Sequence, residues 1–289
     1  MPTETLSPNA QEFFAKLDAI SPGEVHSDLM SRGLYATDAS IYQQTPAGYV
    51  TPRTVDELKR TQKLAFDYAM PVLPRGGGTS LAGQTTAIDA IVIDTSKHLN
   101  KLEEVNEKEM WARVQPGLVR DELNTMLASR GIWFAPETST SNRANIGGMI
   151  GNNSSGMMSV RYGTTISHVL GLNMVLADGS EVYFGRRSEM DKRGVEILDR
   201  LLEIIRPHRA LIEEKFPKVI RRVGGYSLDH FLTEDPNLAM IICGSEGTLA
   251  LMTSAKVRLV PKPKVICAMA IHFHDIIESL RATPLIVKH

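Results

Sequence analysis

The sequence predicts a folded chain in which helices and strands are mixed. Residues 54–57 (TVDE) form a capping box that opens a helix running to about Ala69. Residues 90–94 (AIVID) are an apolar run typical of a buried strand. Asp178 and Gly179 form a hairpin signal between two strand-like segments.

Composition agrees with a folded globular protein. The 289 residues carry 32 basic and 33 acidic side chains, which gives a net charge of −1, and 43% of the residues are hydrophobic. These values exclude a disordered chain and argue against a nucleic-acid-binding protein that depends on positive charge. Only Cys243 and Cys267 are present, so neither a disulfide framework nor a cysteine-based zinc site is expected.

The chain shows no signal for membranes or export. No apolar run approaches the roughly 20 residues that span a bilayer, so no transmembrane helix is expected. The N-terminus has no apolar region typical of a secretory signal. We therefore expect a cytoplasmic protein.

In the first half of the chain, periodicity and turn signals predict eight elements in order. They are a helix at 9–20, a strand at 48–52, the helix at 54–69, a strand at 72–73, a glycine loop at 75–83, the strand at 90–94, an edge hairpin at 102–114 and a helix at 118–128 that Gly131 stops.

The second half begins with a polar segment and continues with strands. The segment 136–163 is rich in Thr, Ser, Asn and Gly. After it we expect strands at 169–176 and 182–184, a helix at 195–205 that Pro207 stops, a strand at 238–243 and an alternating stretch that ends near 261–263. Beyond Pro263, a strand at 265–273 and a helix at 276–282, interrupted by Pro284, read as the first unit of a truncated domain.

The first glycine cluster, residues 74–84 (PRGGGTSLAGQ), follows a predicted strand. Consecutive glycines let successive backbone N–H groups point into one concavity, which suits phosphate oxygens. Thr79 and Ser80 add hydroxyl donors, and Arg75 adds charge. The loop lacks the Gly-Lys-Ser/Thr of a Walker A motif, and Leu81 breaks the Rossmann fingerprint. A tight structural turn is the alternative.

Two further glycine clusters occur later in the chain. Residues 145–156 (NIGGMIGNNSSG), with 136–142 before them, offer many neutral hydrogen-bonding groups and suit a long, flat ligand, although a flexible surface loop is the alternative. Residues 244–249 (GSEGTL) suit a ligand contact or a simple bulge equally well. Together the clusters indicate a large site of little charge, which favours a dinucleotide over a nucleoside triphosphate bound with a metal.

These motifs, with residues 161–163 (RYG), resemble the FAD-binding domain of the vanillyl-alcohol oxidase and p-cresol methylhydroxylase superfamily (PCMH/VAO type). The nearest branch contains D-lactate dehydrogenase, glycolate oxidase and D-2-hydroxyglutarate dehydrogenase, and the resemblance spans about 35–263. It implies an α+β domain of two subdomains with flavin between them. The implied organisation is an N-terminal helical extension at 1–34, the FAD-binding domain at 35–264, and the start of a missing substrate-binding cap domain at 265–289.

The resemblance also implies which residues contact the cofactor. Those expected at the first cluster are Arg75, Gly76, Gly77, Gly78, Thr79, Ser80 and Gln84. Those expected along the central segment are Pro136, Glu137, Thr138, Thr140, Asn145, Gly147, Gly148, Gly151, Asn152, Ser155, Gly156, Tyr162 and Gly163, and those at the third cluster are Glu246, Gly247 and Leu249. Ordinary packing of Tyr162 is an equal alternative.

Family members oxidise a D-2-hydroxy acid to a 2-oxo acid by hydride transfer to FAD, so the resemblance implies this activity for the full-length protein. The first loop contains no His, so we expect non-covalent FAD. Catalytic residues stay unknown because the cap would supply them, and we expect no metal site, although His272 and His274 form a His-x-His pair. The sequence does not identify the electron acceptor, for which an iron–sulfur region or subunit is one candidate. A homo-oligomer is a further expectation that the sequence does not decide.

Three alternative functions remain. The first is a superfamily member with another substrate, the second is a non-catalytic FAD-binding subunit that needs a second chain, and the third is a nucleotide-binding protein without flavin.

Overall fold

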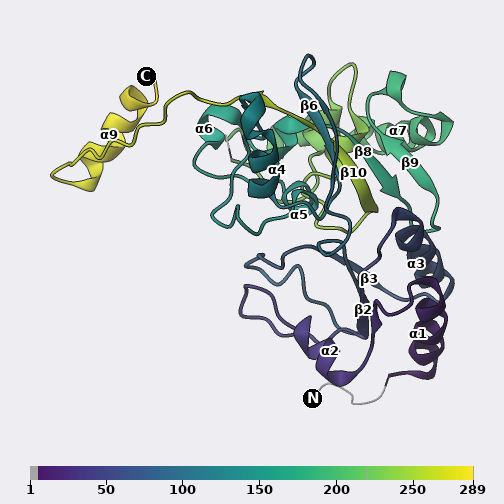
Figure 1. The fold of residues 1–289 in the computed structure, drawn as a ribbon. Helices are drawn as coiled ribbons and strands as arrows, with labels where there is room; N and C mark the ends of the chain where they lie inside the picture. Colours follow the sequence, from purple (N-terminus) through teal and green to yellow (C-terminus); the bar gives the residue numbers. More distant parts are fainter. Residues whose placement is uncertain (1–5, 220, 289) are drawn as a thin grey trace.

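The computed structural model describes residues 6–219 and 221–288, which form two subdomains in succession along the chain (Figure 1). The first subdomain runs from α1 (Pro8–Ile20) to β4 (Ile91–Asp94), and the second from β5 (Leu102–Asn106) to β11 (Val260–Pro261). Beyond β11, an extended segment leads to α9 (Ile276–Ile286), which lies apart from both bodies. The predicted mixture of helices and strands in an α+β fold is confirmed.

The first subdomain is a four-stranded sheet covered by helices. Its other elements are β1 (Val25–His26), α2 (Leu29–Leu34), β2 (Gly48–Val50), α3 (Val55–Asp67) and β3 (Val72–Arg75). The strand order is β1-β2-β4-β3, and β2, β4 and β3 run parallel. Arg75 and Asp94 therefore sit opposite each other at the carboxyl ends of neighbouring strands, where parallel sheets commonly place ligand-binding loops.

Helices α1 and α3 lie side by side on this sheet (Figure 1). Phe13 and Leu17 of α1 and Leu58 of α3 are fully buried in one core with β2 and β4. The segment expected as an N-terminal extension thus shares its core with the first subdomain. Thr54 caps α3 as predicted, accepting from the Glu57 N–H at 3.1 Å, whereas the Glu57 carboxylate accepts from the N–H of Arg53.

The second subdomain is built on an antiparallel five-stranded sheet of order β5-β6-β10-β8-β9. Its remaining strands are β6 (Trp111–Val114), β7 (Ile132–Trp133), β8 (Val169–Val175), β9 (Glu181–Phe184) and β10 (Leu251–Arg258), with β7 pairing β11. Its helices are α4 (Arg120–Leu127), α5 (Ile146–Gly151), α6 (Ser159–Tyr162), α7 (Lys192–Ile205) and α8 (Arg209–Lys215). Val175 and Leu251 at the ends of β8 and β10 pack into the core of the first subdomain and join the two bodies.

Two sequence-based predictions in the second subdomain were wrong. The strand expected at 238–243 is a buried 3₁₀ helix over Leu238–Ile241, because a short apolar run has no period that separates strand from buried helix. The Asn237 side chain accepts from the Ala239 N–H and fixes the turn. Pro207 does not stop helical structure either, since it lies near the start of a 3₁₀ turn that continues into α8.

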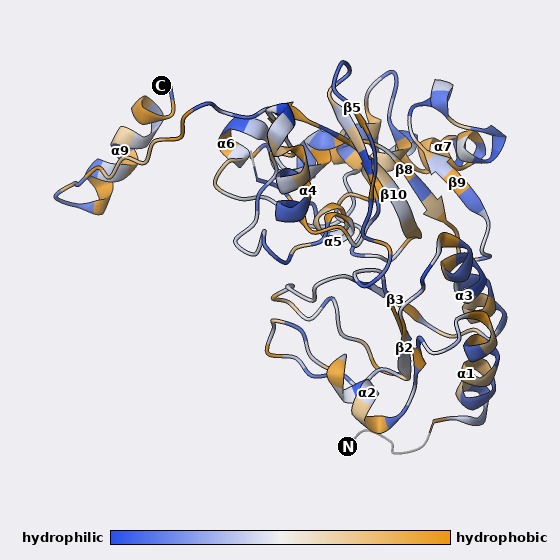
Figure 2. Ribbon diagram, viewed as in Figure 1, coloured by the Kyte–Doolittle hydropathy of each residue, from blue (hydrophilic) through white to orange (hydrophobic). Residues whose placement is uncertain are grey.

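Two predictions beyond β11 were also wrong. The strand expected at 265–273 is an extended segment without strand pairing, and its apolar residues are exposed. Figure 2 shows the hydrophobic residues along the path to α9. A strand needs a partner edge, and the described residues offer none there. Helix α9 forms as expected but includes Pro284 rather than breaking at it. None of the helices in residues 6–219 and 221–288 is long and apolar enough to cross a membrane.

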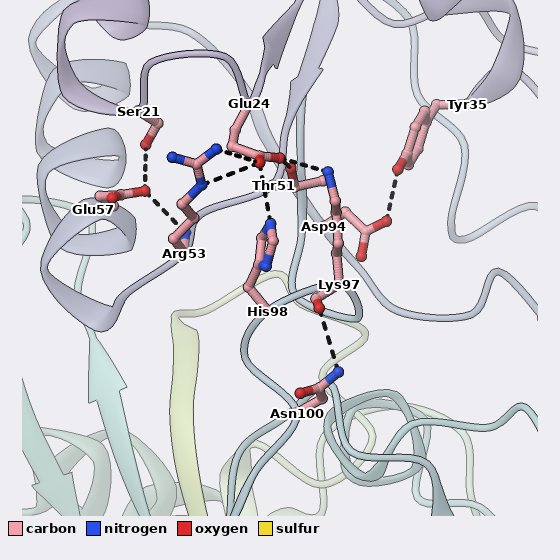
Figure 3. Close-up of polar contacts among 10 residues, drawn as sticks. All are labelled: Ser21, Glu24, Tyr35, Thr51, Arg53, Glu57, Asp94, Lys97, His98 and Asn100. Carbon is pink, nitrogen blue, oxygen red and sulfur yellow. Dashed lines mark hydrogen bonds and ion pairs between the residues drawn. The ribbon is translucent and has the colours of Figure 1, made fainter.

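A buried acid ties together the loops at one edge of the first sheet (Figure 3). The Glu24 carboxylate accepts hydrogen bonds from Arg53 Nη2 at 2.9 Å and Lys97 Nζ at 2.8 Å, and also from the Thr51 hydroxyl. His98 Nε2 lies 3.3 Å from the same carboxylate. These groups come from the segments after β2 and β4, so Glu24 fixes both loops relative to β1.

Candidate functional site

The three glycine clusters meet at a cavity between the two subdomains. The cavity consists of two adjoining hollows that share Gly76, Ser80, Gln84, Gly148 and Glu246 in their walls. The first cluster follows β3, the second forms α5 and the turn after it, and the third precedes β10. Segments more than 150 residues apart in sequence therefore line one hollow.

Most of the residues predicted as cofactor contacts line this cavity. They are Arg75, Gly76, Gly77, Gly78, Thr79, Ser80, Gln84, Thr138, Thr140, Asn145, Gly147, Gly148, Gly151, Asn152, Ser155, Glu246 and Gly247. Those that do not line either hollow are Pro136, Glu137, Gly156, Tyr162, Gly163 and Leu249.

Other lining residues were missed by the sequence analysis. They include Leu58, Thr85, Thr95, Pro116, Met174, Ala250, Leu251 and Met252. Most lie in ordinary helices and strands or next to them, so no local motif marked them.

The first glycine loop packs directly against the segment before α5. A Cβ on Gly76 would lie 2.6 Å from Asn145 Oδ1, and one on Gly77 would lie 2.5 Å from the Arg143 carbonyl oxygen. Gly78 has a φ of +62°, which side chains rarely adopt. The loop therefore needs glycine both for close backbone contact and for its turn.

Arg75 hydrogen-bonds to the protein backbone, although its position in the glycine loop suggests a contact with the ligand. Its guanidinium donates to the carbonyl oxygens of Thr37 at 2.8 Å, Thr85 at 2.9 Å and Tyr35 at 3.2 Å. The same group lies 5.1 Å from the centre of the Tyr35 ring. Arg75 thus stabilises the start of the loop through three hydrogen bonds from its guanidinium to backbone carbonyl oxygens.

Asn145 links the second cluster to the turn between β6 and α4. It is 4% exposed, and its Nδ2 donates to the Gly117 carbonyl oxygen. Its Oδ1 is buried without a hydrogen-bond partner and faces the backbone of Gly76. The side chain does not cap α5, although Asn145 occupies the N-cap position.

The third cluster contacts both of the others. The Glu246 N–H donates to the Gly151 carbonyl oxygen at 2.9 Å, and a Cβ on Gly247 would lie 2.6 Å from Pro74 Cγ. Glu246 itself has a left-handed φ of +53°. Burial raises the pKa of the Glu246 carboxyl above its ordinary value, and a hydrogen bond with Gln84 opposes this only in part.

Four of the predicted residues outside the cavity, Pro136, Glu137, Gly156 and Tyr162, have structural partners. Tyr162 packs edge-to-face on Trp133 at 5.9 Å, and its carbonyl oxygen lies 2.9 Å from His168 Nε2, so the packing alternative describes its contacts. Gly156 contacts the Glu137 backbone closely, since a Cβ there would lie 2.6 Å from the Glu137 carbonyl oxygen. The Pro136 carbonyl oxygen accepts from Arg120 Nε.

The cavity wall carries little charge. Arg75 and Glu246 are the two charged side chains that line it among the described residues. Within the same part of the chain, no group of three or more His, Cys, Asp and Glu side chains could hold a metal ion. The arrangement suits a long, largely neutral ligand held by backbone and hydroxyl groups.

Comparison with known proteins agrees with this geometry. Residues 46–185 match the FAD binding domain family. The chain is 37% identical over 280 residues to D-2-hydroxyglutarate dehydrogenase of Pseudomonas putida, which covers 92% of this chain and 28% of that protein. It is 31% identical over 234 residues to glycolate oxidase subunit GlcD of Bacillus subtilis, covering 81% of this chain and 41% of that subunit.

Solved structures share the fold. An alkyldihydroxyacetonephosphate synthase superposes with a TM-score of 0.65 at 21% identity, covering 91% of this chain and 42% of the synthase. A p-cresol methylhydroxylase superposes with a TM-score of 0.60 at 14% identity, covering 92% and 46%. The sequence matches confirm the resemblance, and the structural matches confirm the fold that the motifs predicted. The chain spans less than half the length of each of these proteins.

Proposed function

Because residues 46–185 match the FAD binding domain family, we propose that the chain holds FAD in the inter-subdomain cavity as part of a flavin-dependent 2-hydroxy-acid dehydrogenase. The observation that carries the proposal is the convergence of three glycine clusters on one cavity. FAD, when bound, supplies the acceptor for the hydride that leaves the α-carbon of a 2-hydroxy acid.

The residues present fit such a cofactor. Gly148 and Gly151 line the cavity, and a Cβ on either would meet nothing within 4 Å, so their missing side chains leave open space. The wall offers neutral donors and acceptors, including Thr79, Ser80 and Thr138, over the length of both hollows. The six predicted contacts outside the cavity are not part of this proposal.

The substrate class rests on the relatives. The names D-2-hydroxyglutarate dehydrogenase, glycolate oxidase subunit and D-lactate dehydrogenase describe proteins that act on 2-hydroxy acids. We propose the same substrate class for the full-length protein, with electrons passing to an acceptor that the sequence does not identify. Non-covalent attachment, a homo-oligomer and a cytoplasmic location stay predictions.

Absorption spectroscopy tests the cofactor assignment. The purified chain, incubated with FAD and freed of excess, should show a flavin spectrum, and denaturation should release the flavin. Gly148→Phe should abolish binding because the ring would fill open cavity space. Gly33→Phe is the matched control, since Gly33 also has open space around a helical position but lies in α2, outside the cavity. Flavin bound equally by both variants would overturn the placement.

The substrate is tested on the full-length protein. Anaerobic addition of D-2-hydroxyglutarate, D-lactate or glycolate should bleach the flavin spectrum, and the fastest of the three identifies the preferred acid. A flavin that none of them reduces would support the alternative of a non-catalytic FAD-binding subunit.

A further inference from the structure

The charge of the cavity wall does not balance that of a dinucleotide. FAD brings two negatively charged phosphates, whereas the cavity is lined by one basic and one acidic side chain among the described residues. The basic one, Arg75, already donates to three backbone carbonyl oxygens. The acidic one, Glu246, shares its wall with Gly76 and Ser80 of the loop expected to hold the phosphates.

Glu246 is held at this position by its backbone. Its N–H donates to the Gly151 carbonyl oxygen at 2.9 Å, and its left-handed φ of +53° sets the direction of the side chain. Glu246 and Gln84 line both hollows together with Gly76 and Ser80, and Gln84 Oε1 accepts from the Ala82 N–H at 3.1 Å. The acid therefore faces the first glycine loop.

Among the described residues, Glu246 forms no ion pair. The segment 221–226 carries Arg221, which is exposed, and Arg222, which pairs with Asp229 at 2.6 Å. Its Tyr226 hydroxyl lies 2.8 Å from Thr248 Oγ1. Helix α5 contributes no titratable side chain, and the first loop contributes only Arg75. Burial raises the pKa of Glu246, so the free protein already favours its neutral form more than an exposed glutamate would.

We propose that FAD binding is coupled to the uptake of one proton by Glu246, so that the neutral carboxyl faces the bound dinucleotide. The proton comes from solvent, and no covalent bond changes. A carboxylate beside the phosphates would repel them, whereas the protonated carboxyl can donate a hydrogen bond. This inference rests on the proposed function, because it requires FAD in this cavity.

The direction in which pH changes the Kd of FAD follows from the linkage between proton binding and FAD binding. Protonated Glu246 binds FAD more tightly, so the Kd of FAD should rise with pH through the pKa of the carboxyl in the free protein. The rise is at most tenfold per pH unit and levels off above the higher pKa of the complex. Glu246→Gln mimics the neutral acid and should bind FAD with a Kd that is independent of pH and close to the low-pH value of the wild type.

Isothermal titration of the full chain with FAD from pH 5 to 8.5 tests the proposal. Runs in two buffers of different ionisation enthalpy count protons, and we expect an uptake approaching one for the wild type and zero for Glu246→Gln. Glu213→Gln is the control, because Glu213 is an exposed acid that pairs only with Arg209 within α8, and it should behave like the wild type.

The outcomes separate the two proposals. A wild-type Kd that does not change with pH, or a proton uptake that persists in Glu246→Gln, overturns the inference and leaves FAD binding intact. Absence of FAD binding by the wild type at every pH overturns the proposed function and this inference with it. If Glu246→Gln folds poorly, a proton uptake near zero in the wild type still overturns the inference.

Discussion

Glu24 offers a sharp test of how the first subdomain is held together. Its residue surface is 4% exposed, and Figure 3 shows Arg53, Lys97 and His98 converging on its carboxylate. In Glu24→Gln the shape is kept, but the charge is lost and an amide N–H₂ replaces one acceptor oxygen. Donors from four residues, Arg53, Lys97, His98 and Thr51, then compete for a single oxygen.

The size of the effect follows from the exposure of the partners. Breaking a buried ion pair by removing one member costs about 3–5 kcal/mol. The side chains of Arg53 and Lys97 are each 54% exposed and regain water when their partner is lost, so the lower end applies. We expect a loss of about 3 kcal/mol in the free energy of unfolding, which lowers Tm by roughly 6–12 °C.

The effect should also depend on pH. Burial by itself raises the pKa of Glu24, but hydrogen bonds from Lys97, Thr51, Arg53 and His98 outweigh it and hold the pKa well below its ordinary value of 4.5. The stabilisation is therefore fully present above about pH 4.5 and is lost as the pH falls toward the lowered pKa. The difference between wild type and variant should shrink below pH 4.5.

Thermal unfolding monitored by circular dichroism measures both effects. Glu213→Gln, which removes an exposed i,i+4 pair, should change Tm by less than about 2 °C because such pairs contribute little. If Glu24→Gln and Glu213→Gln lower Tm equally, the network in Figure 3 does not stabilise the fold as argued.

Three further predictions concern the site and its surroundings. Arg75→Lys loses most of the bonds to Tyr35, Thr37 and Thr85 and should destabilise the chain by about 2 kcal/mol in denaturant unfolding, with weaker FAD binding. Because the donors of Arg75 are engaged within the protein, the Kd of FAD measured by fluorescence should change less than about threefold between low and moderate salt. Burial lowers the pKa of His168 below 6.5, so the unfolded chain binds protons more readily and stability should fall as the pH drops below 6.5. His168→Gln should flatten this dependence of Tm on pH, and an unchanged slope would contradict the assignment.

Local signals identified most of the fold because each was carried by residues close in sequence. The cap of α3 and the turn of the β8–β9 hairpin, with Asp178 and Gly179 at its tip, needed only a few neighbouring residues. The prediction for 238–243 failed because a short run buried on all sides shows no period that separates a strand from a buried helix. The segment 265–273 failed because strand pairing depends on a partner that the sequence of the segment does not reveal.

The site was predicted in part for the same reason. Glycine clusters are visible in the sequence, but their convergence depends on Val175 and Leu251 packing into the first core, which joins the subdomains. The role of Arg75 was also hidden, because its hydrogen-bond partners are backbone carbonyl oxygens that any residue supplies. Side chains that bind backbone leave no matching signal elsewhere in the sequence.

Some glycines of the site allow close contact between loops, and others leave space for the ligand. Substituting one glycine of each kind should therefore have different effects. A Cβ on Gly77 would lie 2.5 Å from the Arg143 carbonyl oxygen, so this glycine lets two loops of the protein meet. A Cβ on Gly148 would meet nothing, so that glycine leaves space for the ligand. Gly77→Ala should therefore lower the Tm of the FAD-free chain and weaken FAD binding together. Gly148→Ala should weaken FAD binding while raising Tm slightly, because alanine favours the helix by about 1 kcal/mol over glycine. Equal Tm changes in the two variants would show that both glycines serve the same purpose, and the distinction between loop contact and ligand space would then be wrong.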